Sequence, residues 1–250
     1  MTPRPIFVVA GVGNGSGTGG ASARVFLNAG YRVALIARKS DELTKFAGEL
    51  KAKGEAEAFP IAAYTYKDVE TAFSAIKKHW PDSEIRVALY NAGIGVWKPF
   101  LQITEEDIDK VTDSNVKGAF AFAKEAVSTF KDQALDGNGK RGTLLFTGAT
   151  ASIRGNVTTS AFAAGKFSLR SLSQSLAKEF GKQNIHVAHA VIDGAIATDK
   201  QRNNRDPSWA DNADVRLDPE SIAKSYLYLA NQDRSAWTWE LDLRPAHEKW

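Results

Sequence analysis

The feature that most constrains the fold is an alternation of short apolar segments with longer amphipathic segments along the chain. The short segments are rich in β-branched and aromatic residues, which favours strands, and the longer segments repeat apolar residues at helical spacing. Strands that alternate with helices are joined by right-handed crossovers into a parallel sheet. The sequence therefore predicts a single α/β domain over residues 1–250, with helices flanking a mainly parallel, seven-stranded, doubly wound sheet. The expected strands are 6–10, 32–36, 56–61, 85–90, 143–147, 185–192 and 237–241, and the expected helices lie near 20–29, 41–53, 67–79, 105–113, 115–133, 161–181 and 219–231.

Composition and charge exclude several classes of protein. Hydrophobic residues make up 43% of the 250 residues and charged residues 24%, as in soluble globular proteins. The net charge is only +3 and the basic residues are scattered, so the cationic stripe that nucleic-acid binding needs is missing. The absence of cysteine excludes disulfides, thiol catalysis and cysteine-ligated zinc, and no other metal-ligand spacing occurs. The apolar run 6–10 is too short for a signal peptide or a membrane span, so we expect a soluble, cytoplasmic protein without a membrane partner.

A run of glycines, AGVGNGSGTGG at 10–20, stands directly between the first expected strand and the first expected helix. Backbone N–H groups at a helix N terminus bind phosphate, and glycine allows the chain to come close to it. The run is therefore typical of a dinucleotide site in a Rossmann fold, although a flexible turn would use the same residues. A P-loop is excluded because no Gly-Lys-Ser/Thr sequence follows.

The residues after the second expected strand indicate which dinucleotide is bound. An NAD site needs an acidic side chain there, which accepts a hydrogen bond from the ribose 2′-hydroxyl. Here the small Ala37 is followed by Arg38 and Lys39, whose charges suit a 2′-phosphate. We therefore predict NADP(H) as the cofactor. The alternative is a solvated basic pair at the start of a helix.

Three more motifs follow in order along the chain. Asn91-Ala92-Gly93 comes after the fourth expected strand, Asn115 lies in a helical segment, and Asp193-Gly194-Ala195-Ile196-Ala197-Thr198 follows the sixth strand. With the glycine run, these motifs resemble those of the short-chain dehydrogenase/reductase family over essentially the whole chain. The resemblance implies an oxidoreductase that acts on a small molecule and forms a homodimer or homotetramer. Gly13, Gly17 and Gly19 match the family's glycine motif. The resemblance also implies that the cofactor is contacted by Gly13, Asn14, Ser16, Gly17, Thr18, Gly19, Asn91, Ala92, Gly93, Lys166, Gly194, Ile196 and Thr198.

The expected catalytic centre departs from the family pattern. The family's Tyr-x-x-x-Lys motif is represented by Phe162 and Lys166, so the lysine is kept but its partner has no hydroxyl. The family's catalytic serine falls on Thr150 or Ala149, and only the threonine can donate a hydrogen bond. Asn115 matches the asparagine that supports the family's proton relay. Because a general acid contributes about 10²–10⁴-fold in rate, ketone reduction by the family's route should be impaired.

Asp193 is a candidate replacement acid, because it stands where the family has proline, beside the expected nicotinamide site. The alternative is a carboxylate that bonds to the nearby turn backbone. The long polar segment 195–217 is expected to be a lid on the substrate side. With Arg154 and the loop 153–160, this lid would shape the substrate pocket.

Three functions are consistent with these residues. The leading hypothesis is NADP(H)-dependent hydride transfer between nicotinamide and a carbonyl or activated double bond, with an altered proton-donating centre. The missing hydroxyl at Phe162 would slow the reduction of an enone or an iminium less than that of a ketone, because less charge on oxygen needs neutralising. The alternatives are a catalytically silent NADP-binding sensor or scaffold, and a non-redox enzyme on the same fold.

Overall fold

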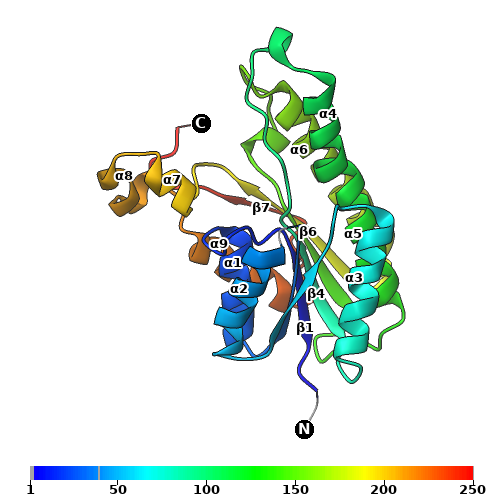
Figure 1. The fold of residues 1–250 in the computed structure, drawn as a ribbon. Coiled ribbons are helices and arrows are strands. Elements are labelled where there is room, and N and C mark those ends of the chain that lie inside the picture. The colour runs from blue at the N-terminus through cyan, green and yellow to red at the C-terminus, as the bar shows by residue number, and fades with distance from the viewer. Residues whose placement is uncertain (1–2, 39, 250) are drawn as a thin grey trace.

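The computed structural model describes residues 3–38 and 40–249, which build a seven-stranded sheet between two layers of helices (Figure 1). The strands lie in the order β3-β2-β1-β4-β5-β6-β7, and every pairing is parallel. This confirms the predicted α/β architecture. The strands are β1 (Ile6–Ala10), β2 (Arg32–Ala37), β3 (Ala56–Pro60), β4 (Ile85–Tyr90), β5 (Gly142–Thr147), β6 (Ile185–Ile192) and β7 (Glu240–Leu243).

The helices cover both faces of the sheet, each against its own apolar cluster. Strands β1 and β6 are therefore buried along their whole length; β1 is apolar throughout, and β6 is apolar apart from His186 and His189. Among the described residues, none of the helices has both the length and the apolar character that crossing a membrane requires. One face carries α1 (Thr18–Asn28), α2 (Ser40–Lys51) and α9 (Pro219–Asn231), and the other carries α3 (Tyr66–His79), α5 (Gly118–Lys131) and α6 (Ser160–Phe180).

Helix starts follow local signals in the sequence. Before α4 (Glu105–Val111), the Thr104 hydroxyl accepts a hydrogen bond from the backbone N of Asp107, and the Asp107 carboxylate accepts one from the backbone N of Thr104. Asp218 caps α9 and Pro219 occupies its first turn, where a missing N–H costs nothing. Both ends therefore satisfy backbone groups that helices otherwise leave unpaired.

The segment between α4 and α5 differs from the expected pair of separate helices. Residues Thr112–Lys117 form a π-helical turn that joins α4 to α5. Asn115 lies buried in this turn, and its side chain accepts a hydrogen bond from the backbone N of Ile94 at 2.8 Å and donates one to the carbonyl O of Ile94 at 2.9 Å. The π turn thus fixes Asn115 to the chain that leaves β4, and such turns are frequent at functional sites.

The last strand is displaced from its expected position at 237–241 to Glu240–Leu243. The aromatic run before it has other contacts, because the Trp237 ring stacks on His186 with centroids 4.9 Å apart. The ladder then continues as far as Leu243, whose carbonyl accepts the backbone N–H of Asp193 at 2.8 Å. This register brings the chain that follows β7 to the end of β6.

The polar segment 195–217 is folded rather than open. It contains two short helices, α7 (Asp199–Asn203) and α8 (Pro207–Asp211), and a 3₁₀ turn at Ala213–Val215. Thr198 and Asp206 cap the two helices through their side chains. Local capping therefore gives this segment structure that its low apolar content did not predict.

Candidate active site

A cleft of about 1190 Å³ opens at the carboxyl ends of the strands. It adjoins β1 and β4, which are neighbours in the sheet. The strands that follow β1 in the sequence lie toward one edge of the sheet, and those that follow β4 lie toward the other edge. Ligands of open α/β sheets bind at such a reversal point. Every cofactor residue predicted from the sequence lines this cleft except Lys39, which lies outside the described residues. Of the predicted catalytic residues, Lys166, Thr150, Phe162 and Asp193 line it, and Asn115 lies next to the lining residue Gly93.

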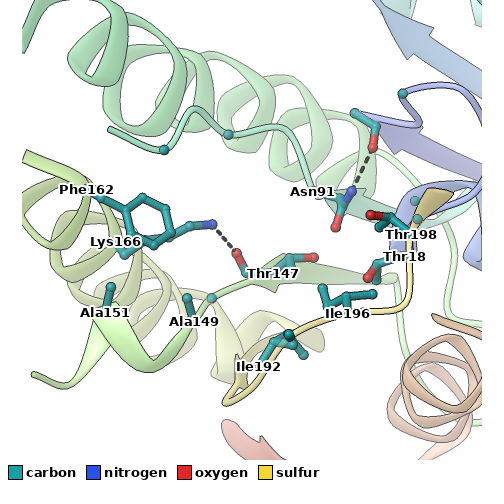
Figure 2. A pocket seen from close by; sticks show the side chains of 18 of the residues that line it. Thr18, Asn91, Thr147, Ala149, Ala151, Phe162, Lys166, Ile192, Ile196 and Thr198 are labelled. Atoms are coloured by element: carbon teal, nitrogen blue, oxygen red, sulfur yellow. Dashed lines mark hydrogen bonds between the residues drawn. The ribbon is translucent and has the colours of Figure 1, made fainter. Parts of the chain in front are cut away.

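The glycine run packs tightly against the turn that follows β4. A Cβ on Gly11, whose φ is +93°, would lie 2.4 Å from the backbone N of Ala92, and a Cβ on Gly19 would lie 2.3 Å from the carbonyl O of Gly11. The Asn91 side chain donates a hydrogen bond to that same carbonyl at 2.7 Å (Figure 2). Only glycine fits at these two positions, so the loop and the N terminus of α1 form a cradle of backbone.

The structure also describes the glycines that the family's spacing singled out. A Cβ on Gly13 would meet nothing within 4 Å, and one on Gly17 would meet only the Thr198 methyl at 3.4 Å. Of the three glycines in that motif, only Gly19 is closely packed, while Gly13 and Gly17 line the open side of the loop. Among the described residues, the buried Thr18 hydroxyl at the start of α1 has no hydrogen-bond partner. A backbone cradle with an unpartnered hydroxyl at a helix N terminus fits the phosphates of a dinucleotide.

Two polar side chains of the glycine run contact the segment that carries α7. Asn14 donates a hydrogen bond to the Asp199 carboxylate at 3.0 Å, and the Ser16 hydroxyl accepts one from the backbone N of Asp199 at 3.2 Å. Ser16 in turn donates to the Asn14 side chain at 2.7 Å. Besides lining the cleft, Asn14 and Ser16 thus tie the glycine loop to residues 195–217.

Arg38 lies at the end of β2, where the adenosine end of a dinucleotide is expected. Its side chain is exposed, lines the cleft next to Ala37, and holds its guanidinium carbon 5.9 Å from the centre of the Tyr64 ring. Burial raises the pKa of the Tyr64 phenol to about 12. The cation is therefore positioned against an aromatic face and open to an anion.

Lys166 and Phe162 share one face of α6, one turn apart, and both point into the cleft (Figure 2). The Lys166 ammonium donates a hydrogen bond to the carbonyl O of Thr147 at 2.8 Å and lies 5.9 Å from the centre of the Phe162 ring. Burial lowers the pKa of Lys166 to about 8. A Cβ on Gly93 would lie 3.5 Å from Lys166 Nζ and 3.3 Å from Asn115 Oδ1, so these three residues meet at one point.

Asp193 is bound by side chains, not by the turn backbone. The Thr150 hydroxyl donates a short hydrogen bond to its carboxylate. Two guanidiniums face the same group, Arg154 at 3.9 Å and Arg244 at 3.3 Å, and the carboxylate side chain is only 3% exposed. The hydroxyl that was expected to serve the substrate therefore directs its proton to Asp193.

Several cleft residues escaped prediction from the sequence. Glu248 and Lys249 reach the cleft from the C-terminal segment, and Arg244, which follows β7, pairs with the cleft residue Asp193. Gly95 and Trp97, in the chain between β4 and α4, also line it. No local motif marks these residues, because only the folded chain brings them together.

Other titratable groups in the core have structural partners. The Tyr90 hydroxyl donates to the carbonyl O of Ser114 at 2.5 Å, and burial raises the pKa of this fully buried phenol well above its usual range. His186 and His189, on opposite faces of β6, bond to the Thr238 carbonyl and the Glu240 carboxylate, and burial lowers the pKa of each to about 4. Within residues 3–38 and 40–249 there is no cluster of ligands that would hold a metal ion.

Comparison with known proteins agrees with this geometry. A family model described as short chain dehydrogenase matches residues 7–209. The chain belongs to this family. A 3-oxoacyl-[acyl-carrier-protein] reductase of Mus musculus is 29% identical over 205 residues, 82% of each chain. A probable NADP-dependent mannitol dehydrogenase of Yarrowia lipolytica is 30% identical over 92% of this chain and 83% of the relative. The crystal structure of a short-chain dehydrogenase from Rhodopseudomonas palustris superposes with a TM-score of 0.78 at 30% identity, covering 97% of this chain and 100% of the other.

Proposed function

We propose that this short-chain dehydrogenase is an NADP(H)-dependent oxidoreductase with an altered proton-donating centre, acting on a carbonyl or an activated double bond. One observation carries the proposal: the backbone cradle at Gly11 and Gly19 and the buried Lys166 ammonium line a single cleft. Phosphate binding needs the cradle, and a nicotinamide ribose needs a donor such as Lys166.

The residues divide between the two ends of the cofactor. Arg38 would bind the 2′-phosphate, the cradle and Thr18 the diphosphate, and Lys166 the nicotinamide ribose, with Ile196 and Thr198 beside the ring. When bound, NADP(H) supplies or accepts the hydride. The name of the Yarrowia lipolytica relative, an NADP-dependent dehydrogenase, supports the same cofactor here.

The proton-donating centre differs from a tyrosine-based one because Phe162 has no hydroxyl. Asp193 already accepts the hydrogen bond of Thr150 and lies 3.9 Å from the guanidinium of Arg154 and 3.3 Å from that of Arg244. We therefore assign Asp193 a positioning role, in which it orients Thr150 and Arg154. Lys166, with its pKa lowered to about 8 by burial, is the group whose charge stabilises a developing oxyanion.

A silent NADP-binding sensor is the second candidate. The observation in its favour is that Thr150 is bonded to Asp193 and Phe162 is apolar, so the positions that match the family's catalytic serine and tyrosine offer no donor of the family's kind. Both candidates use the same cofactor residues. Hydride transfer separates them.

The first test is titration of the protein with NADPH and NADH, followed by nicotinamide and tryptophan fluorescence. Arg38→Ala should weaken NADPH binding about 10- to 100-fold, because a charged hydrogen bond contributes about 1.5–3 kcal/mol, and should leave NADH binding unchanged. Lys53→Ala removes an exposed cation outside the cleft and is the matched control. Equal affinity of wild type and Arg38→Ala for NADPH would refute the phosphate assignment. Turnover of aldehydes, ketones, enones or imines by the NADPH complex then favours the enzyme over the sensor.

A further inference from the structure

An aromatic pair forms part of the cleft wall next to Lys166. Trp97 lies in the chain after β4 and Phe162 in the first turn of α6, with ring centroids 5.0 Å apart and ring planes at 44°. Both side chains line the cleft. Since the Phe162 ring also lies 5.9 Å from Lys166 Nζ, the pair adjoins the centre proposed for the reaction.

Trp97 leaves much of its indole open to solvent although it stands in a cleft. The residue is 62% exposed, whereas the Phe162 ring behind it is half-buried. A large apolar surface inside a concave site favours ligand binding over simple packing. Phe100, which is 74% exposed, lies outside the cleft and is a natural comparison.

The chain around Trp97 holds the indole in place. A Cβ on Gly95 would lie 2.1 Å from the indole Cη2, so the ring rests on glycine backbone that any other residue would block. Lys98, the next residue in the chain, is bound at both its backbone and its side chain. Its backbone N donates a hydrogen bond to the carbonyl O of Thr158 at 3.0 Å, and the Lys98 ammonium pairs with the Asp107 carboxylate at 2.5 Å. Thr158 has φ of +65°, which is rare for a β-branched residue. These contacts fix the loop and so lower the entropy cost of binding.

We infer that Trp97 and Phe162 bind an aromatic ring of the substrate, so that the preferred substrates are aryl ketones and aryl enones. The inference rests on the proposed function, because it concerns the substrate of that reaction. Aromatic rings with centroids about 4.5–7 Å apart attract each other beyond the effect of buried area, and a flat ligand can lie against both side chains. Reduction of an aryl enone adds the hydride of NADPH to the β-carbon and a proton from solvent to the α-carbon, and leaves NADP⁺.

The test compares pairs of compounds that differ only in whether the ring is aromatic. Acetophenone is paired with cyclohexyl methyl ketone, and benzylideneacetone with its cyclohexyl counterpart. We expect kcat/KM to favour the aryl member about two- to tenfold, the range of an aromatic pair. Trp97→Leu should abolish the preference and Trp97→Phe should retain part of it. Phe100→Leu, which removes an exposed ring outside the cleft, should leave it unchanged.

A binding measurement separates this inference from the proposed function. The alcohols of acetophenone and of its cyclohexyl counterpart are titrated into the NADPH complex, and quenching of tryptophan fluorescence is compared between wild type and Trp97→Leu. Tighter binding of the aryl alcohol that is lost in Trp97→Leu supports the aromatic wall, even without turnover. Equal binding of the two rings, or binding of neither, overturns it and leaves NADPH binding and turnover to decide the proposed function. The NADPH affinity of each variant, measured first, reports on that function alone.

Discussion

Restoring a hydroxyl at position 162 is the most direct test of the altered centre. Phe162→Tyr adds one oxygen to a ring that shares a helix face with Lys166 and whose centre lies 5.9 Å from the Lys166 ammonium. A positive charge at that distance lowers the pKa of a phenol and so improves it as a proton donor. A positioned general acid contributes about 10²–10⁴-fold in rate. A single donor to an oxyanion contributes about 2.7–4 kcal/mol, equivalent to about 10²–10³-fold, so the two routes agree.

The assay is the initial rate of NADPH oxidation with acetophenone and with benzylideneacetone. We expect kcat/KM for the ketone to rise about 10²- to 10³-fold in Phe162→Tyr and that for the enone to change by less than about tenfold, because less charge on oxygen needs neutralising. Phe167→Tyr, which places the same hydroxyl on an exposed position of α6, should change neither rate. If Phe162→Tyr binds NADPH normally and its kcat/KM for the ketone does not rise, Phe162 does not stand at the reacting centre.

Two further predictions concern the ammonium and the glycine cradle. Burial holds the pKa of Lys166 near 8 in the folded protein, below its ordinary 10.5. Between pH 8 and pH 10.5, the unfolded chain therefore binds more protons at Lys166 than the folded chain does. The free energy of unfolding should therefore rise by about 2–3 kcal/mol from pH 8 to 10.5 relative to Lys166→Met, as measured by urea titration, and a flat difference would contradict the burial effect. Gly19→Ala should abolish NADPH binding, because its Cβ would meet the Gly11 carbonyl at 2.3 Å. The matched change Gly48→Ala, in open space on α2, should preserve binding and stabilise the fold by about 0.4–1 kcal/mol in the same titration. Normal NADPH affinity in Gly19→Ala would rule out the cradle.

Local patterns were sufficient to predict most of the fold. The strands at Ile6–Ala10, Ile85–Tyr90 and Ile185–Ile192 have the predicted bounds, because a strand buried on both faces is mainly apolar and ends where glycine or polar residues begin. The displaced β7 shows the limit of this signal. Its aromatic residues suggested an earlier start, but the Trp237 ring stacks on His186, a contact between segments far apart in the sequence.

In the candidate site, too, local spacing predicts some residues and not others. Glycines, Asn91 and Lys166 stand at recognisable spacings, because each serves backbone geometry or a cofactor at a fixed place after a strand. The partners of Asp193 could not be anticipated, since Arg244 comes from the chain after β7 and meets Asp193 only when β6 and β7 pair. The π-helical turn at Asn115 likewise depends on the chain after β4, which supplies both of its side-chain hydrogen bonds.

The choice between enzyme and sensor turns on what the cleft offers beyond the cofactor. Under the proposed function, the glycine cradle, Arg38 and Lys166 would bind NADP(H) in either case, so they favour neither. Trp97 is different, because its ring contacts that of Phe162, rests on Gly95 and keeps 62% of its surface exposed while lining the same cleft. A protein that only sensed the cofactor would gain nothing from holding an open aromatic surface there. The aromatic surface of Trp97 and Phe162 can bind a flat ligand other than the cofactor. We therefore favour an oxidoreductase whose substrate carries an aromatic ring.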